Sequence, residues 1–369
     1  MPRHGDATSF PHLQLLMAIA QEKQGEAGDT LRANGFDARG FLSACTKHQL
    51  AGFAYRWLQG AGLLGLLPDA VRCDLRLFYQ SQLAKNIMVL KGTEALSARF
   101  RAAGEPLIIL KGPLFGLRYY GHIGWRSTGD IDVLVREPGG IRRGHELAES
   151  CGFRRRSLVF GNERLMTRFI HHFEYEKGHL RLDLHWALRR HWNLRIDHGR
   201  VWETAVTMHA LGQEAVVPGD EYALLLHLLG LLDDIQCGRG VLRSIIDVYY
   251  LLRRVEEHWD WAAFFGRRRE EGTERASVQT IGLVLDSLAA GELPVLRDEI
   301  GRRRRLVRAR QPASPFELLG RGAVSMSRKL WGLTAYEGSL VSSIAWWGVS
   351  LPFRTAACSP LLQSLWSRS

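Results

Sequence analysis

The stretch STGDIDVLV, residues 127–135, places Asp130 and Asp132 one residue apart at the start of an apolar run. Carboxylates are rarely buried unless something compensates their charge. Because alternate side chains of a strand share a face, the two carboxylates point to one side, about 6.6 Å apart along the strand, while Ile131 and Val133 pack on the other. The pattern predicts either a turn that leads into a strand or a pair of carboxylates that holds a cation.

A third aspartate has a similar setting in LRLDLHWAL, residues 180–188. Strand alternation puts Asp183 and His185 on one face and the neighbouring Leu182 and Leu184 on the other. If this strand lies next to the first one, Asp183 completes a triad with Asp130 and Asp132. Three carboxylates without cysteine suit a hard, oxygen-preferring ion, which points to Mg²⁺ or Mn²⁺.

The segment LKGPLFG, residues 110–116, supplies what a phosphate group needs. Gly112 allows close approach of the backbone, and the free N–H groups that open the following helix form an anion site. Lys111 adds a point charge, and Arg126, shortly before the aspartates, adds a forked guanidinium. A Lys-Gly turn is common by itself, but its combination with the aspartates favours a nucleotide–metal site over a structural turn.

Histidines gather near the third aspartate. His171 and His172 precede a strand close to Asp183, and His185 follows that aspartate by two positions. Because no cysteine accompanies these histidines, a zinc site built from them is less favoured than substrate positioning or hydrogen bonding in the sheet. We expect His185 to contact the nucleotide.

Two helical segments in the C-terminal half carry further candidates. His227 lies in an almost wholly apolar helix, where a histidine is more often a core residue than a ligand. Arg243 and Asp247 are four residues apart, the spacing of an ion pair on a helix surface. Arg243 is also a candidate to reach a nucleotide phosphate.

The composition is that of a folded, basic protein. The 369 residues are 46% hydrophobic and 24% charged, which allows a sizeable core and argues against wholesale disorder. The net charge of +11 comes largely from arginine clusters such as 267–269 and 301–310. A basic balance favours polyanionic partners, nucleic acid among them, but runs this short are more typical of a solvated helix face. Nucleic acid is therefore not the favoured partner.

Cysteine usage and apolar segments indicate the compartment. The five cysteines are scattered and show no CxxC spacing, which favours a reducing environment such as the cytoplasm. The first residues do not have the pattern of a signal peptide. The apolar segment 340–353 is shorter than the roughly 20 residues that a transmembrane helix needs. We therefore expect a cytoplasmic protein without a transmembrane segment.

Periodicity along the chain predicts an α+β fold. Residues 10–100 carry apolar side chains at three- and four-residue spacing, which indicates helices. Residues 106–188 follow the order strand–helix–strand–helix–strand–strand, which implies a small mixed sheet. Past residue 218 the pattern is helical again, and after residue 311 it is irregular.

The long stretch LIILKGPLFGLRYYGHIGWRSTGDIDVLV, followed by HHFEYEKGHLRLDLHWAL, resembles the uncharacterised nucleotidyltransferases of the DNA polymerase β superfamily. The resemblance covers about 106–190 and continues more weakly through His227 and Asp247. The wider superfamily usually has Gly-Ser or Gly-Gly at the phosphate turn and a shorter gap to the first aspartate, whereas this chain has Lys-Gly there. The matching positions are Lys111, Gly112, Tyr120, Arg126, Asp130, Asp132, Asp183, His185 and Trp186.

The resemblance implies a nucleotidyltransferase core at 101–215. Apolar periodicity predicts a helical N-terminal region at 1–100 and a helical C-terminal region at 216–311, with an extension of unclear structure at 312–369. The resemblance also implies two-metal transfer of a nucleoside monophosphate from an NTP to an unknown acceptor, which could be a small molecule, a peptide or a protein. In that reaction, two of the residues named above, Asp130 and Asp132, would bridge both ions. The third, Asp183, would hold the catalytic ion.

Two other functions stay open. The fold could serve as a non-catalytic module that binds polyanions or peptides, or it could transfer a sugar from a nucleotide-sugar to a peptide with the help of a metal. An intact acidic triad argues against mere binding. The sequence has no nucleophile elbow, Walker phosphate loop or dinucleotide-binding glycine motif, so serine hydrolases, P-loop kinases and Rossmann dehydrogenases lack support.

The metal-site interpretation carries expectations for two variants. Asp132→Asn should be neutral or stabilising without metal, because like-charge repulsion is relieved, and should abolish stabilisation by metal. Lys111→Ala should raise the apparent KM for NTP more than it disturbs folding, because a lysine at a strand end carries little of the core.

Overall fold

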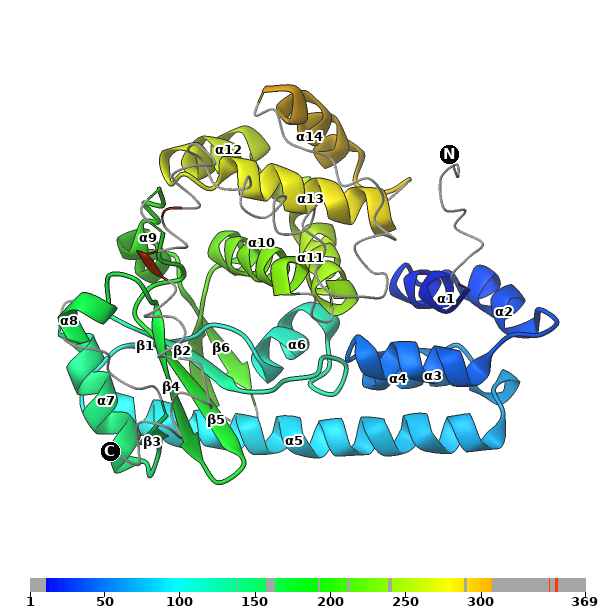
Figure 1. Ribbon diagram of the computed structural model, residues 1–369, viewed down its shortest axis with the longest axis horizontal. Helices are drawn as coiled ribbons and strands as arrows, with labels where there is room; N and C mark the ends of the chain where they lie inside the picture. The colour runs from blue at the N-terminus through cyan, green and yellow to red at the C-terminus, as the bar shows by residue number, and fades with distance from the viewer. Residues whose placement is uncertain are drawn as a thin grey trace.

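The computed structural model describes residues 11–137, 139–156, 163–191, 193–210, 213–237, 241–288 and 291–306, together with 345, 349 and 350. The predicted extension at 312–369 lies outside the described residues except at those last positions. Within the described ranges, helices at both ends of the sequence surround one mixed sheet (Figure 1).

The N-terminal part forms the helices that its apolar periodicity predicts. They are α1 (Pro11–Ala20), α2 (Gln24–Arg32), α3 (Ala38–Lys47), α4 (Ala51–Gly60) and α5 (Asp69–Ala102), with a 3-10 turn, η2 (Leu64–Leu66). A side-chain cap fixes the start of α3, because the Asp37 carboxylate accepts the Gly40 N–H at 2.8 Å. Pro68 stands directly before α5, where its missing N–H costs no helical hydrogen bond.

The predicted mixed sheet is confirmed, and so is the α+β class. Its strands run in the order β1-β2-β5-β4-β3, with β2 and β5 parallel and the other neighbours antiparallel. The segments PLIIL, DIDVLV and LRLDLHW therefore lie in one sheet. The strands are β1 (Leu107–Ile109), β2 (Ile131–Val135), β3 (Arg154–Arg155), β4 (His172–Lys177) and β5 (Leu180–His185), and the intervening helices are α6 (Pro113–Tyr120), α7 (Gly140–Ser150) and α8 (Glu163–Met166).

A helix and a two-stranded hairpin that the sequence did not predict follow the sheet. The helix is α9 (His198–Glu203), and the hairpin pairs β6 (Val206–Ala210) with β7 (Gln213–Val217), which lies beside β1. Along β6, Val206 and Thr207 are both exposed and only Ala210 is buried, so the strand lacks the alternation that would have predicted it.

The C-terminal part is helical, as predicted. Its elements are α10 (Asp220–Cys237), α11 (Val241–Val255), α12 (Trp261–Glu270), α13 (Glu274–Leu288) and α14 (Pro294–Leu306), with a 3-10 turn, η3 (Glu256–His258). Even the leucine-rich α10 is not a membrane span: no helix in the described part of the chain is long and apolar enough to cross a bilayer.

The two faces of the sheet pack against different helices. Ile131, Val133 and Leu184 share a core with residues of α5 and α7, whereas Leu134 packs in a second core that includes residues of α10 and α11. Figure 1 shows α5 running below the sheet and below α3 and α4, with α10 and α11 above. The predicted alternation in β2 and β5 is thus confirmed, and the face that carries the aspartates is the one opposite α5 and α7.

The second core joins the two helical parts of the chain. The ring of Phe53 in α4 lies 6.0 Å from that of Tyr120 in α6 and 6.1 Å from that of Tyr250 in α11. The predicted division of the chain at residues 100, 215 and 311 stays a prediction, because one apolar cluster contains members from both sides of the sheet region.

The arginine clusters are largely engaged in ion pairs between helices. Arg267 and Arg268 of α12 both contact Glu221 of α10, and Arg303 of α14 contacts Glu274 of α13 at 2.6 Å. Arg268 has no exposed side-chain surface. The expectation of a solvated helix face is therefore wrong for these arginines, which hold the C-terminal helices together.

The close approach of α5 to the sheet depends on Gly92. A Cβ atom there would meet the terminal methyl groups of Ile131 and Leu180 at 2.9 Å. We predict that Gly92→Leu destabilises the fold by about 1–3 kcal/mol, the usual effect of overpacking a core. Chemical denaturation would measure this change.

Gly266 in α12 offers the matched control, since no heavy atom lies within 4 Å of a Cβ added there. Gly266→Leu should stabilise its helix by up to about 1 kcal/mol, because leucine favours helix over glycine. Equal effects of the two substitutions would contradict the tight contact between α5 and the sheet.

Candidate active site

Three carboxylates, those of Asp132, Asp183 and Glu174, lie side by side across three neighbouring strands, and we call them the carboxylate row. Asp132 of β2 is opposite Asp183 of β5, and Asp183 is opposite Glu174 of β4. Residues that are directly opposite in a sheet point to the same face. Asp130 stands two residues before Asp132, immediately ahead of β2. The sheet thus brings the predicted aspartates together, and it adds a glutamate that the sequence did not single out.

Asp132 is the most buried member of this group. Its side chain is 1% exposed, and its Oδ1 accepts from Lys111 Nζ at 2.9 Å and lies 3.3 Å from His185 Nε2. The backbone N–H of Leu110 donates to the Asp132 carbonyl at 2.9 Å, which carries the chain from β1 directly to Lys111. Lys111 and His185 therefore share one oxygen of a buried carboxylate.

The carboxylates differ in how readily they ionise. Burial by itself would raise the pKa of Asp132, but attraction to Lys111 and the hydrogen bond with His185 outweigh it and hold that pKa below its ordinary value. Burial, with repulsion from Asp132 and Asp130, raises the pKa of Asp183 well above its ordinary value. Repulsion from Asp132, with burial, also raises the pKa of Asp130. Additional positive charge near Asp130 and Asp183 would favour their ionised forms.

The donor atoms of this group fit a divalent cation. Asp132, Asp183 and His185 each offer one ligand atom within 4.8 Å of the others. Oδ2 of Asp132 is buried and receives no hydrogen bond from any described residue. A buried carboxylate oxygen without a donor is costly unless a cation takes that position. The carboxylates that would hold a hard ion are those that the sequence predicted.

The Lys-Gly turn adopts a backbone that requires glycine. Gly112 has φ +93° and ψ −149°, and α6 begins at the next residue, Pro113. Proline suits this first helical position, because its missing N–H would have no helical partner there. A Cβ atom on Gly112 would lie 3.5 Å from Cγ2 of Thr128, in the loop before the aspartates. The turn therefore presents the start of α6 next to that loop.

Arg126 pairs with Asp247, and Tyr120 contacts the same carboxylate. Its Nε lies 3.0 Å from each carboxylate oxygen of Asp247 in α11, and the Tyr120 hydroxyl donates to the same carboxylate at 2.7 Å. The arginine side chain is 6% exposed. Among the described residues, its hydrogen bonds are made by Nε, and neither Nη nitrogen donates one. Its predicted contact with phosphate stays a prediction.

His227 has the contacts of a core residue. Its Nδ1 donates to the Ala223 carbonyl at 2.8 Å, and its ring stacks on Phe115 with 3.9 Å between centroids. Burial lowers the pKa of His227 to about 4, so the imidazole is neutral at physiological pH.

Arg243 does not form the helix-surface ion pair that its spacing suggested. Its Nη1 donates to Gln49 at 2.5 Å, and its Nη2 lies 4.0 Å from Asp234, whereas Asp247 pairs with Arg126. None of these contacts involves the carboxylate row. The predicted contact of Arg243 with the nucleotide stays a prediction.

The sequence profile of a family described as uncharacterised nucleotidyltransferase matches residues 34–287, which is most of the chain and includes every residue of the candidate site. The chain belongs to this family. The family suggested by the sequence is thereby confirmed. A search of curated proteins finds no match.

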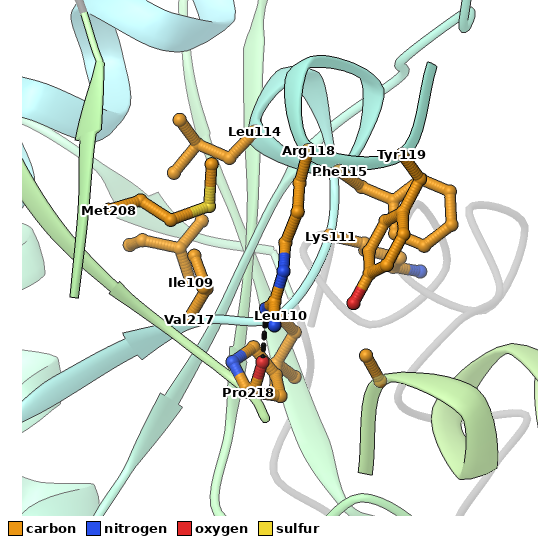
Figure 2. A pocket seen from close by; sticks show the side chains of 11 residues that line it. Ile109, Leu110, Lys111, Leu114, Phe115, Arg118, Tyr119, Met208, Val217 and Pro218 are labelled. Atoms are coloured by element: carbon orange, nitrogen blue, oxygen red, sulfur yellow. Dashed lines mark hydrogen bonds between the residues drawn. The ribbon is translucent and has the colours of Figure 1, made fainter. Parts of the chain in front are cut away.

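Beside the carboxylate row, this nucleotidyltransferase has a mostly apolar hollow of about 230 Å³ between β1, α6, β7 and the start of α10. Figure 2 shows Leu114 and Met208 on one side of it and Tyr119 on the other, with Lys111 at its rim. Arg118 and Pro218 also line this hollow, and the Arg118 Nη1 donates to the Pro218 carbonyl at 2.6 Å.

One member of the site could have been found from the sequence, whereas one pairing in the site could not. Glu174 alternates with His172 in HHFEYEKG, and a turn at Gly178 places it opposite Asp183. The pairing of Asp247 with Arg126 joins residues 121 apart, for which no local pattern exists.

The structure changes the expectation for two variants of the apo nucleotidyltransferase. Asp132→Asn should destabilise it, because the ionised carboxylate is held by Lys111; the loss is about 1.5–3 kcal/mol, as for a hydrogen bond to a charged group. Lys111→Ala should destabilise it for the same reason. We therefore now expect Asp132→Asn to lower stability, where the sequence suggested a neutral or stabilising effect, and Lys111→Ala to disturb folding as well as the KM for NTP. Asp183→Asn should be neutral or stabilising.

The effect of Asp183→Asn should depend on pH. A raised pKa in the folded state gives stability that is present below the ordinary value of 3.8 and is lost as pH rises through the folded value. Without metal, the variant should equal the wild type near pH 4 and exceed it in stability at pH 8, which urea unfolding with a chelator would measure. Asp29→Asn, at an exposed position, is the control. Parallel pH profiles for Asp183→Asn and the wild type would contradict the charge repulsion.

Proposed function

We propose that this chain transfers a nucleoside monophosphate from an NTP to an acceptor oxygen with the help of two divalent ions, Mg²⁺ or Mn²⁺. The observation that supports this most is the carboxylate row: Asp132 and Asp183 share a register position on one sheet face, with Asp130 beside them and the Lys111–Gly112 turn next to them. Family membership supports the reaction class.

The residues take distinct parts in the proposed reaction. Asp130, Asp132 and Asp183 would hold the ions, which when bound neutralise charge on the transferred phosphate and on the leaving pyrophosphate. The free N–H groups after Gly112 would bind a phosphate oxygen. The Nη nitrogens of Arg126, whose Nε is fixed by Asp247, would bind another.

In the transfer step, the acceptor oxygen bonds to the α-phosphorus while the bond from that phosphorus to the bridging oxygen breaks. Pyrophosphate leaves with the electron pair of that bond. Asp183 is placed to accept the proton of the acceptor, because it lies in the row beside Asp132 and is partly exposed. The acceptor is a molecule with a hydroxyl, carboxylate or phosphate oxygen, and a peptide is one candidate.

The alternative functions fit the site less well. A module that only binds polyanions gains nothing from two carboxylates whose pKa values are raised by mutual repulsion and burial. Many of its arginines are also paired within the C-terminal helices and do not form a free basic surface. Sugar transfer from a nucleotide-sugar would use the same ions, and the labelled donor distinguishes it. We also propose that the protein is cytoplasmic.

The reaction can be tested by incubating the protein with each α-labelled NTP, Mg²⁺ and a cell extract, and then identifying the labelled product. We predict transfer of label with release of pyrophosphate, and loss of transfer in Asp183→Asn. Mg²⁺ with NTP should also raise the melting temperature, since a ligand at 100 times its Kd stabilises the native state by about 2.7 kcal/mol. Label transfer that persists in Asp183→Asn, or that follows only a labelled nucleotide-sugar, would contradict the proposal.

The part of Arg126 can be tested with a conservative pair. Arg126→Lys keeps a positive charge but removes the fork, and it should raise the KM for NTP by roughly tenfold or more, the value of a charged hydrogen bond. Arg142→Lys is the control, because the Arg142 side chain is 90% exposed and contacts Glu146 of the same helix. Equal KM changes in both variants would mean that the two arginines do not differ in phosphate binding.

A further inference from the structure

Three imidazoles meet where β4 begins and β5 ends. His172 is opposite His185 in the sheet, and His171 directly precedes β4. The ring centroids of His171 and His172 are 4.7 Å apart, those of His172 and His185 are 4.8 Å apart, and those of His171 and His185 are 5.5 Å apart. One ligand nitrogen from each lies within 4.8 Å of the others.

His185 is oriented as metal-binding histidines are. Its Nε2 lies 3.3 Å from Asp132 Oδ1, and because Asp132 is an acceptor, Nε2 carries the proton of that hydrogen bond. Nδ1 then has a free lone pair. It is buried and has no partner among the described residues, and the ring as a whole is 5% exposed. A carboxylate that fixes one ring nitrogen leaves the other as a stronger metal ligand.

His172 gives a second, separate observation. Its Nδ1 is also buried and has no hydrogen-bond partner among the described residues. Two neighbouring imidazoles with unpartnered buried nitrogens are costly as they stand, because each has lost its contact with water. A single ion that accepts both lone pairs removes that cost.

We propose that His171, His172 and His185 bind one transition-metal dication of the Zn²⁺ class, beside the carboxylates that would hold Mg²⁺; His185, which could serve either group, then serves this ion and leaves Mg²⁺ to the carboxylates. Imidazole nitrogen favours Zn²⁺, Co²⁺ or Ni²⁺, whereas carboxylate oxygen favours Mg²⁺ and Mn²⁺. Three protein ligands leave a fourth position for water or substrate. Cysteine is not needed for such a site, so the lack of a cysteine ligand beside these histidines does not exclude one.

The ligands can reach bonding distance by a small movement. With Zn–N distances of about 2.0–2.1 Å, the ligand nitrogens of a tetrahedral site are about 3.3 Å apart. Nitrogens that now lie within 4.8 Å of one another must therefore close by about 1.5 Å or less. His185 is fixed by Asp132, whereas His171 and His172 are only partly buried and can rotate toward it.

Titration of the metal-free protein with Co²⁺ tests this proposal, because four-coordinate Co²⁺ with nitrogen ligands has an intense visible absorption. We expect one Co²⁺ per chain, displaced by Zn²⁺ but not by millimolar Mg²⁺. His172→Gln should weaken binding by at least about tenfold, since even outer-shell partners of a metal ligand are worth 10–100-fold. His209→Gln, on an exposed strand of the hairpin, is the control and should bind as the wild type does.

Asp183→Asn separates this site from the carboxylate site. It should keep Co²⁺ binding while losing nucleotidyl transfer, so failure of the proposed function leaves the histidine site testable. If His172→Gln does not fold, as judged by circular dichroism, His171→Gln provides the same test. The proposal is overturned by an absent absorption band, by full binding in the histidine variants, or by loss of the band with Mg²⁺ or in Asp183→Asn.

Discussion

The ion pair between Lys111 and Asp132 connects the parts of the molecule that form the site. Asp132 is 1% exposed in the middle of the sheet, and a carboxylate in that position stays ionised only with a compensating charge. Lys111 reaches it from the end of β1, and His185 reaches the same oxygen from β5. One buried charge therefore fixes how the phosphate turn, β2 and β5 lie relative to one another.

The same ion pair makes the carboxyl groups of the site differ in pKa. Asp132 has used the nearby lysine, so Asp183 and Asp130 are left with burial and repulsion, which raise the pKa of both. The protein thus has one carboxylate whose ionised form is stabilised by its neighbours and two whose ionised forms are disfavoured and would be stabilised by a further cation. Functional sites commonly keep such unfavourable interactions because the bound state relieves them. In this chain the cost is confined to one face of the sheet, and the opposite face packs apolar side chains against α5 and α7.

Local patterns predicted this face but not its surroundings. Alternation in DIDVLV and LRLDLHW correctly assigned Asp132 and Asp183 to one side and the leucines of β5 to the other, because a strand has a period of two. The hairpin of β6 and β7 was missed because its burial does not alternate. The partners of Arg126 and Arg268 were missed for another reason. Those ion pairs join the loop before β2 to α11 and join α12 to α10, and sequence spacing contains no information about such distant contacts.

The ion pairs of Lys111 and Arg126 affect the net charge of the site that a substrate enters. Lys111 is balanced by Asp132 and Arg126 by Asp247, so neither basic residue adds net charge to the site. Asp130 and Asp183 remain as acids beside them. A triphosphate is an anion, and Coulomb repulsion would oppose its entry alone at such short distances. In the proposed reaction, the net charge of +11 therefore does not recruit the nucleotide directly. The site favours a nucleotide that arrives with its cations, because those cations satisfy the carboxylates and the phosphates together.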